Sequence, residues 1–430
     1  MMLKTSVKQR NLLIYQVFVR NHTVEGTFNA LIKDLDRIKL LGTDIVYLLP
    51  VHPIGVLNRK GTIGSPYSIQ DYRGINLDLG TLADFKRLIS EVHARKMKIM
   101  MDVVYNHTSR DSVLLRKHPE WFYKNASGAF ANRVGDWWDV TDFDFTSGKE
   151  LWMELTDILK YYTNMGVDGF RCDVASLVPI EFWDYARKAI TKINKNIIWL
   201  SESVHGSFLK YIRDLGFEAA SESEIFQVFD MAYDYDIQNY YEGYLLGKRP
   251  LKDLLEGIIR QEEIYPKNYV KMKNLDNHDV ERLARLVKGD KDKILNWHGF
   301  AFMQKGAVMI YAGSEFSSDK RPDLFEKDVV VRKNDISEFI QTLAKIKKRP
   351  VFANGIWTTN VPEIDGVAYN TVEDDTEKFI GIFNVGLAIG EISVNLPDGT
   401  YKNLLSKTAV VVAKNKITLS HDPVLIRIKK

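Results

Sequence analysis

Strand-like and helix-like segments alternate about eight times over roughly the first 340 residues, and this alternation constrains the fold more than any other feature. The strand-like segments are short, apolar and rich in β-branched or aromatic residues, whereas the helical ones repeat apolar residues at helical spacing. The expected strands are Leu12–Val19, Asp44–Leu49, Lys98–Val104, Met165–Ala175, Asn196–Ser201, Gly216–Ala220, Tyr269–Leu275 and Ala307–Tyr311. The expected helices are Thr27–Leu41, Thr81–Arg95, Gly148–Asn164, Pro179–Asn194 and Asp335–Lys347.

Alternation of this kind indicates parallel βα units, and eight such units favour a closed barrel. A doubly wound open sheet is the alternative, but no G-x-G-x-x-G turn follows the first strand. Beyond Pro350 the sequence changes to short strand-like pieces separated by turns, which is typical of an antiparallel β domain. We therefore expect the α/β class: a (β/α)8 TIM barrel with a short insertion after strand 3 and a C-terminal antiparallel β-sandwich. The predicted division is 1–107 and 147–349 for the two parts of the barrel, 108–146 for the insertion and 350–430 for the β domain.

Composition excludes several classes of partner. The chain has 430 residues and a formal net charge of +3, and no basic run interleaved with aromatics suggests a nucleic-acid partner. No stretch reaches the ~20 apolar residues that span a bilayer, and the polar N-terminus lacks the apolar core of a signal peptide. The single cysteine, Cys172, forms no internal disulfide and fits a reducing compartment. We therefore expect a cytoplasmic protein without nucleic-acid or membrane partners, and the oligomeric state stays open.

Polar side chains follow four of the expected strands at the point where each strand ends. In a βα barrel these ends meet at one face, which carries the active site. Each residue alone has a structural explanation, such as an ion pair or a hydrogen-bonded core histidine. Their coincidence at one rim instead indicates catalysis by the following residues: Asp102, Asn106, His107, Arg171, Asp173, Glu202, His278 and Asp279.

Three acids without a cluster of metal-binding His or Cys residues suggest glycoside hydrolysis. A retaining glycosidase needs a nucleophilic carboxylate and a protonated acid about 5–5.5 Å apart. Arg171 and Asp173 lie on the same face of a strand, and the cation is expected to keep this carboxylate ionised, as a nucleophile requires. Glu202 follows an apolar strand between two serines and suits the general acid, while Asp279 beside His278 suits binding of sugar hydroxyls. Cys172 is expected to face the opposite side as a small buried hydrophobe.

Short motifs carry a family resemblance along nearly the whole chain. They occur in order at Gly64–Tyr72, Asp102–His107, Gly169–Ala175, Glu202, Asn277–Asp279 and Gly306–Gly313 with Glu315. With these motifs the chain resembles the α-amylase superfamily, glycoside hydrolase family 13. The resemblance implies double displacement with net retention on α-linked glucosides, with no cofactor required for the chemistry.

Residue by residue, the resemblance implies a role for each motif position. It makes Asp173 the nucleophile, Glu202 the acid/base and Asp279 the third carboxylate. The residues implied to bind substrate or to fix the nucleophile are Tyr67, His107, Arg171 and His278. Asp102 and Asn106 would support the site, and in many relatives the asparagine also binds calcium.

The sequence also departs from the family's pattern. Ser176–Pro179 stands where amylases often carry Lys-His, which argues against the usual calcium site and the usual contact on the reducing side of the cut, so a Ca²⁺ requirement stays open. Ser203–His205 lacks the common tryptophan after the acid/base. Aromatic residues of the insertion could stack on sugars or form a small core of their own: Trp121, Phe122, Tyr123, Trp137 and Trp138.

The sequence thus predicts a hydrolase of α-1,4-linked malto-oligosaccharides or glucans. The alternatives within the superfamily are an α-1,6-glucosidase, a cyclomaltodextrinase-like enzyme and a transglycosylase. A catalytically inactive carbohydrate-binding relative is the alternative from another class, although such relatives usually lose the carboxylates that this chain keeps. Endo or exo action and the preferred chain length stay open.

Overall fold

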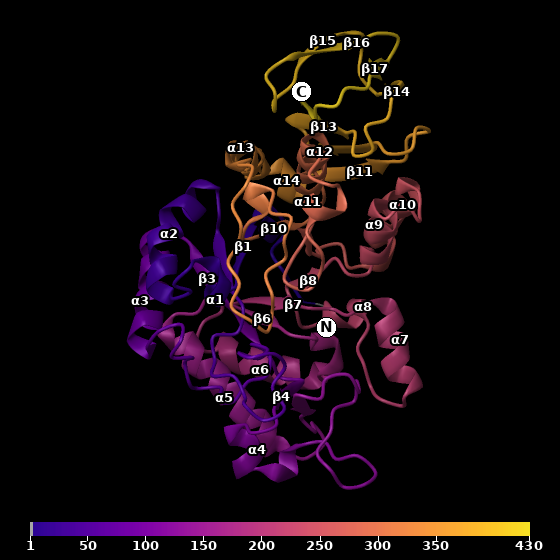
Figure 1. The fold of residues 1–430 in the computed structure, drawn as a ribbon. Coiled ribbons are helices and arrows are strands. Elements are labelled where there is room, and N and C mark those ends of the chain that lie inside the picture. Colours follow the sequence, from indigo (N-terminus) through magenta and orange to yellow (C-terminus); the bar gives the residue numbers. More distant parts are fainter. Residues whose placement is uncertain (1–2) are drawn as a thin grey trace.

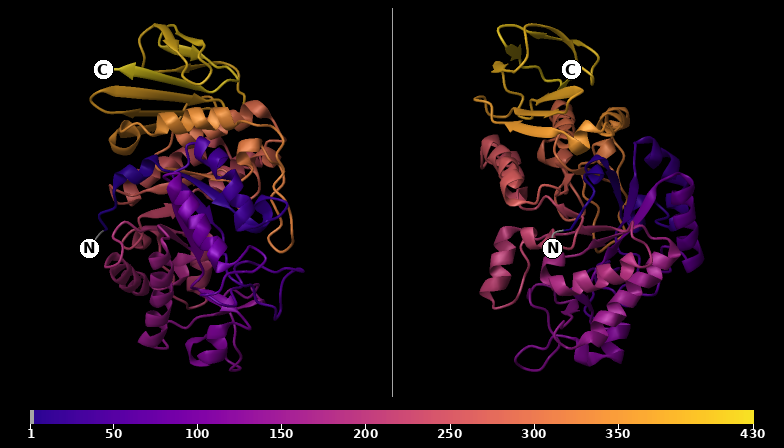
Figure 2. Two further views of the ribbon diagram at one scale, coloured as in Figure 1. Left: turned by 90° about the vertical axis from the view of Figure 1, so that its left-hand side faces the viewer. Right: turned by 180° about the vertical axis from the view of Figure 1, so that it is seen from behind.

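The computed structural model describes residues 3–430, and eight parallel strands close into a barrel at its centre (Figure 1, Figure 2). Their order around the barrel is β1-β10-β9-β8-β7-β6-β3-β2, so the first and last strands pair and close the sheet. The predicted (β/α)8 barrel is confirmed. The barrel strands are β1 (Leu13–Val17), β2 (Ile45–Leu48), β3 (Lys98–Val103), β6 (Gly169–Cys172), β7 (Ile198–Ser201), β8 (Met231–Tyr233), β9 (Lys271–Asn274) and β10 (Ala307–Tyr311).

Helices surround the strands, and local sequence signals set their ends. Thr27 caps α2 by accepting a hydrogen bond from Ala30 N, and Thr81 and Asp84 form a capping box at the start of α3. The long helices are α2 (Phe28–Leu40), α3 (Leu82–Ala94), α5 (Lys149–Met165), α6 (Ile180–Thr191), α10 (Leu251–Ile264), α12 (Lys291–Phe302) and α13 (Ser337–Lys347). The shorter ones are α1 (Val19–His22), α4 (Val113–Lys117), α7 (Gly206–Asp214), α8 (Glu222–Ile225), α9 (Gln238–Leu245), α11 (Leu283–Leu286) and α14 (Val351–Asn354).

The sixth barrel strand is not where the sequence predicts it. Gly216–Ala220 forms the turn after α7, where Phe217 packs edge-on against Tyr123 of the insertion. The strand is instead β8, a three-residue segment whose backbone pairs with β7 and β9. So short a strand carries too few residues for a periodic signal, which is why the prediction at Gly216–Ala220 is wrong.

Two apolar layers hold the barrel together. Side chains such as Tyr47, Met100 and Leu200 fill its interior, and a larger buried cluster lies between the strands and the surrounding helices. Because successive residues of a strand point to opposite faces, Cys172 belongs to the outer cluster and is fully buried, as predicted. Each large apolar side chain buried in this way contributes roughly 1.5–3 kcal/mol.

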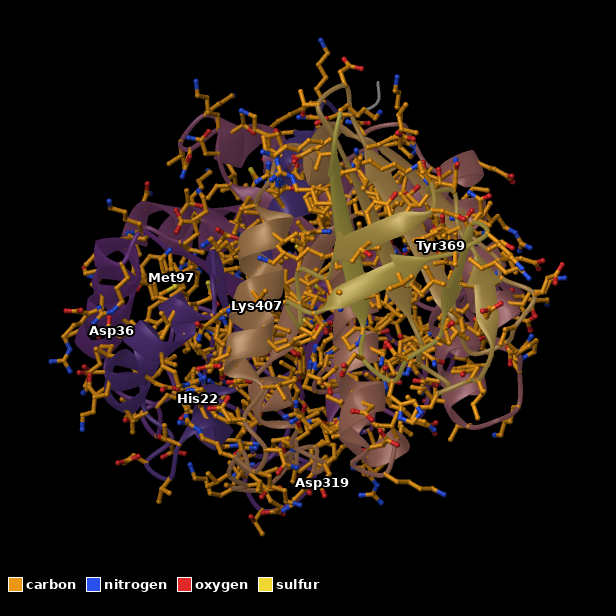
Figure 3. All side chains as sticks on the ribbon, turned by 90° about the horizontal axis from the view of Figure 1, so that it is seen from above. His22, Asp36, Met97, Asp319, Tyr369 and Lys407 are labelled. Atoms are coloured by element: carbon orange, nitrogen blue, oxygen red, sulfur yellow. The ribbon has the colours of Figure 1, made fainter. Side chains whose placement is uncertain are left out.

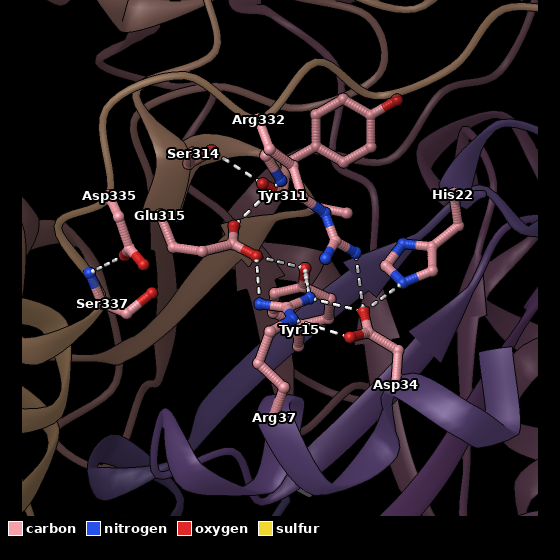
Figure 4. Close-up of polar contacts among 12 residues, drawn as sticks. Tyr15, His22, Asp34, Arg37, Tyr311, Ser314, Glu315, Arg332, Asp335 and Ser337 are labelled. Carbon is pink, nitrogen blue, oxygen red and sulfur yellow. Dashed lines mark hydrogen bonds and ion pairs between the residues drawn. The ribbon is translucent and has the colours of Figure 1, made fainter. Parts of the chain in front are cut away.

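A polar network also ties the last βα unit to the first (Figure 4). The Glu315 carboxylate accepts hydrogen bonds from Tyr15 Oη (2.6 Å) and from Arg37 Nη1 (2.7 Å). Asp34 accepts in turn from Arg37 and His22, and despite burial these hydrogen bonds lower the pKa of Asp34. The network joins β1 and α2 to the segment after β10, so it reinforces the closure of the barrel.

Two further parts complete the chain. The insertion after β3 contains the antiparallel pair β4 (His107–Ser109) and β5 (Val140–Asp142). The C-terminal domain has a four-stranded sheet facing two two-stranded sheets across an apolar core, and Figure 3 looks down on it with Tyr369 among its strands. Its strands are β11 (Ile356–Asn360), β12 (Ala368–Glu373), β13 (Glu377–Phe383), β14 (Glu391–Ser393), β15 (Gly399–Lys402), β16 (Ala409–Val412), β17 (Lys416–Thr418) and β18 (Val424–Lys429). Within residues 3–430, no helix is both long and apolar enough to span a membrane.

Candidate active site

Arg171 lies at the centre of the site and has no exposed surface. Its Nη1 is 2.8 Å from Asp102 Oδ1 and 2.9 Å from Asp173 Oδ1, and its Nη2 is 2.8 Å from Glu202 Oε1. The barrel register explains this arrangement, because Asp102 on β3 pairs directly with Arg171 on β6, and β7 leads to Glu202 on the other side. One guanidinium therefore bridges three carboxyl groups that are far apart in the sequence.

A single positive charge among these carboxyl groups leaves an excess of negative charge. Burial, and next the charge of Glu202, raise the pKa of Asp173 well above its usual value, although Arg171 acts in the opposite direction. Burial also raises the pKa of Asp102. Burial and Glu202 thus oppose the expected effect of Arg171 on Asp173, because this cation is shared. The cluster instead favours keeping one proton among its carboxyl groups, and a nucleophile–acid pair needs one such proton.

Tyr67, His278 and Asp279 form a second polar group beside the first. Tyr67 Oη donates to Asp102 Oδ2 (2.9 Å) and lies 2.5 Å from His278 Nε2, and the two rings stack with centroids 5.3 Å apart. His278 Nε2 also lies 3.0 Å from Asp279 Oδ2. Burial, with a further contribution from Arg171, lowers the pKa of His278 to about 3, so the imidazole is neutral at physiological pH. A neutral N–H donor beside a carboxylate suits recognition of a hydroxyl group.

His107 approaches the predicted nucleophile from the start of β4. Its Nε2 is 3.9 Å from Asp173 Oδ2, and Asn106 Nδ2 lies 3.1 Å from its Nδ1. Burial, followed by the charge of Lys60, lowers the pKa of His107 to about 3. His107 is therefore a second neutral group at the carboxylate oxygen that does not face Arg171.

The backbone at the nucleophile is strained. Val174 has a φ of 35°, in the left-handed region that β-branched residues rarely adopt. In this conformation Val174 N donates a hydrogen bond to Glu202 Oε2, 2.8 Å away. Strain of this kind costs of order 1–3 kcal/mol and is typical of functional sites. Here it fixes the side chain of Glu202 relative to Asp173.

The predicted residues separate into those that line a cavity and those behind it. The cavity holds about 590 Å³ and opens at the face where the strands end. Arg171, Asp102 and Asn106 do not line it, so Arg171 contacts the carboxyl groups from behind. The predicted residues that line it are Asp173, Glu202, Asp279, Tyr67, His107 and His278.

Sequence reasoning missed several lining residues and left others undecided. Phe208 on α7 and Tyr235 after β8 both line the cavity, but neither belongs to a motif. Among the aromatic residues of the insertion, Trp137 lines the cavity, whereas Trp121 is buried in the core. Trp138 is 56% exposed. A signal for Phe208 existed in its position shortly after Glu202, but apolar residues at that distance are common.

A calcium ion beside Asn106 would take six to eight oxygen ligands. Asp142, buried on β5, instead directs Oδ2 at Arg133 N (2.8 Å) and Arg133 Nη1 (3.3 Å), and the same Nη1 donates to Phe143 O. Within the described part of the chain no group of three or more His, Cys, Asp or Glu side chains could hold a metal ion. A guanidinium already supplies the positive charge here.

Comparison with known proteins places this site in a family. Residues 14–360 match the family described as alpha amylase, catalytic domain, and residues 360–426 match the bacterial alpha amylase C-terminal domain. The chain belongs to the α-amylase family. The family resemblance that the motifs predict is therefore confirmed.

Solved structures of amylases resemble this family member over their whole length. An alpha-amylase from Lactobacillus plantarum is 42% identical, with a TM-score of 0.95 over 98% of this chain and 100% of that one. The noncanonic maltogenic alpha-amylase AmyB from Thermotoga neapolitana is 31% identical, with a TM-score of 0.88 over 98% of this chain and 100% of that one.

Curated relatives of the α-amylase family are longer. The alpha-1,4-glucan:maltose-1-phosphate maltosyltransferase of Picrophilus torridus is 30% identical over 55% of this chain and 41% of its own length. Alpha-amylase MalA of Haloarcula japonica is 27% identical over 95% of this chain and 61% of that protein. The chain thus spans less than two thirds of the length of these relatives.

Proposed function

We propose that this family member is a retaining α-glucoside hydrolase that cuts α-1,4 bonds of malto-oligosaccharides or glucans by double displacement. The observation that carries the proposal is the Arg171 bridge, which holds Asp173 and Glu202 as close neighbours on one cavity with Asp279. A retaining reaction needs its two carboxyl groups about 5–5.5 Å apart, whereas an inverting one leaves room for a water molecule between them, and a guanidinium that contacts both groups supports the closer arrangement.

In the first step Asp173 attacks the anomeric carbon while Glu202 protonates the departing oxygen. Oδ1 of Asp173 faces Arg171, so Oδ2, on the side of His107, is the attacking oxygen. Both oxygens of Glu202 are engaged, one by Arg171 and one by Val174 N. The acid form of Glu202 therefore gives up one of these contacts when a sugar enters, and the contact with the neutral amide is the weaker one.

In the second step water replaces the leaving group, and Glu202 takes its proton as a general base. The glycosyl–Asp173 ester is cleaved with a second inversion, so the anomeric configuration is retained. Asp279 and His278 hold hydroxyl groups of the same sugar through their carboxylate and neutral N–H. Asp279 also adds negative charge near the oxocarbenium-like transition state.

Product analysis tests this proposal. The purified protein is incubated with maltoheptaose, β-cyclodextrin, isomaltotriose, sucrose and starch, and the products are separated by chromatography alongside Asp173→Asn. Shorter maltosides from maltoheptaose that are absent with the variant are the expected result. Cleavage of isomaltotriose alone would contradict the α-1,4 assignment and favour an α-1,6-glucosidase.

A transglycosylase is the second candidate, because similar proteins include maltosyltransferases. Its signature is products longer than the substrate at high maltoheptaose concentration. Turnover of none of the substrates by a folded protein would contradict both enzyme proposals and favour an inactive binding relative.

A further inference from the structure

Two aromatic side chains from separate segments meet on one wall of the catalytic cavity. Trp137 comes from the insertion after β3, and Phe208 comes from α7. Their ring centroids are 6.4 Å apart with an interplanar angle of 32°, and Trp137 also lies 5.2 Å from the ring of His107. The two rings thus make one aromatic surface that begins beside the nucleophile.

Phe208 connects this surface to the segment that follows the acid/base. Glu202 protonates the departing oxygen, so the leaving sugar must lie on the side of Glu202. Ser203–His205 lines the cavity directly after Glu202, and α7 with Phe208 follows. Tyr67, His278 and Asp279 form their own hydrogen-bonded group around the other sugar.

The segment after the nucleophile turns away from the catalytic cavity. Ser176–Pro179 lines a different cavity of about 560 Å³, together with Arg213 and Glu224. After the nucleophile, Val174 is the last residue of this stretch that lines the catalytic cavity. The contact with the leaving sugar therefore has to come from other residues.

We propose that Trp137 and Phe208 form the binding platform for the first sugar of the leaving group. The inference rests on the proposed function, since it assigns a subsite of the same cavity. The C–H-rich face of a pyranose packs on an aromatic ring, whereas its hydroxyl groups at the edge need polar partners. His205, stacked on Tyr235 with centroids 4.8 Å apart, and Glu242 line the cavity as polar partners for that edge.

Two substrates that share a maltosyl group but differ in the leaving group distinguish binding of the leaving sugar from other effects of a substitution. α-Maltosyl fluoride loses fluoride and needs no sugar on the platform, whereas maltotriose releases glucose. We expect Phe208→Ala and Trp137→Ala to lower kcat/KM for maltotriose about tenfold, equivalent to about 1.4 kcal/mol, and for the fluoride less than threefold. With maltotriose the loss should appear mainly as a higher KM.

Two controls isolate the platform from the helix that carries it. Lys210→Ala changes an exposed residue on α7 that does not line the cavity, and should act like wild type on both substrates. Phe217→Ala removes the contact of the segment after α7 with Tyr123 and with Arg133, whose guanidinium lies 5.5 Å from the Phe217 ring. This variant measures how far weaker packing of α7 by itself changes the ratio of kcat/KM for the two substrates.

The outcomes separate this proposal from the proposed function. If the wild type turned over neither substrate, the proposed function would be overturned, and the platform with it. Equal losses on both substrates in Phe208→Ala and Trp137→Ala would overturn the platform and leave the hydrolase proposal standing. If Phe217→Ala changed the ratio of kcat/KM for the two substrates as much as Phe208→Ala does, the platform would also be overturned. The effect would then come from the position of α7.

Discussion

Replacing Arg171 by methionine removes the only cation that contacts Asp102, Asp173 and Glu202 among residues 3–430. Methionine preserves much of the buried volume, so the main loss is electrostatic. Removing one partner of a buried ion pair costs about 3–5 kcal/mol, because the remaining charge is left uncompensated. Arg171 has no exposed surface and makes three contacts of 2.8–2.9 Å. We therefore expect the loss of unfolding free energy in Arg171→Met to lie at the upper end of this range.

The loss of unfolding free energy in Arg171→Met should increase with pH. Burial already raises the pKa of Asp102 and Asp173 in the folded protein above the ~3.9 of an unfolded chain, and loss of Arg171 raises it further. The folded variant therefore binds protons more tightly than its unfolded chain, so its deficit grows as pH rises above about 4. We expect a larger deficit at pH 7 than at pH 4.5.

Chemical denaturation at both pH values, followed by tryptophan fluorescence, measures this difference. Arg187→Met is the matched control, since Arg187 pairs with Asp230 at 2.9 Å outside the cavity with 18% of its side chain exposed. The control should lose less stability and keep its activity. An equal deficit of Arg171→Met at pH 7 and pH 4.5 would refute the electrostatic reasoning.

Two further predictions follow from the site and the insertion. Glu202→Gln should lower turnover of malto-oligosaccharides far more than of activated aryl glucosides, which need no acid; equal losses on both would argue against the acid role. The melting temperature of the wild type should not respond to a chelator or to added Ca²⁺. Arg133→Gln should lose up to about 3–5 kcal/mol of unfolding free energy, because Asp142 stays buried without its cation. A chelator-induced fall in melting temperature that Ca²⁺ reverses would contradict this account of the insertion.

The sequence predicted seven of the eight barrel strands because most of them are short apolar runs, several of them followed by an amphipathic helix. It could not place β8, whose three residues lie between Asp230 and Asp234. It also did not show that Lys271 and Lys273 on β9 are buried, where lysine usually indicates a surface. Lys271 contacts Glu222 and Asp236, and Lys273 contacts Asp234, so their partners come from other segments that only the closed barrel brings near. The exact domain limits stay predictions.

The site was predictable where a motif names a residue and unpredictable where only the fold brings residues together. Asp173, Glu202 and Asp279 were found from their places at strand ends, and they share one cavity. The sharing of Arg171 by three carboxyl groups depends on the register of β3, β6 and β7, which sequence does not give. Phe208 belongs to no motif, and its distance from Trp137 is set by the packing of α7 on the insertion.

The central claim is that Asp173 forms a covalent bond to the sugar while Glu202 moves the proton. Trapping that intermediate tests it most directly. A 5-fluoro α-glycosyl fluoride slows both steps but keeps a good leaving group, so the glycosyl-enzyme accumulates and mass spectrometry locates it. We predict a mass increase of one fluoroglycosyl group on the peptide that contains Asp173, and none in Asp173→Asn. A label on another residue, or an active enzyme that never acquires one, would contradict the account.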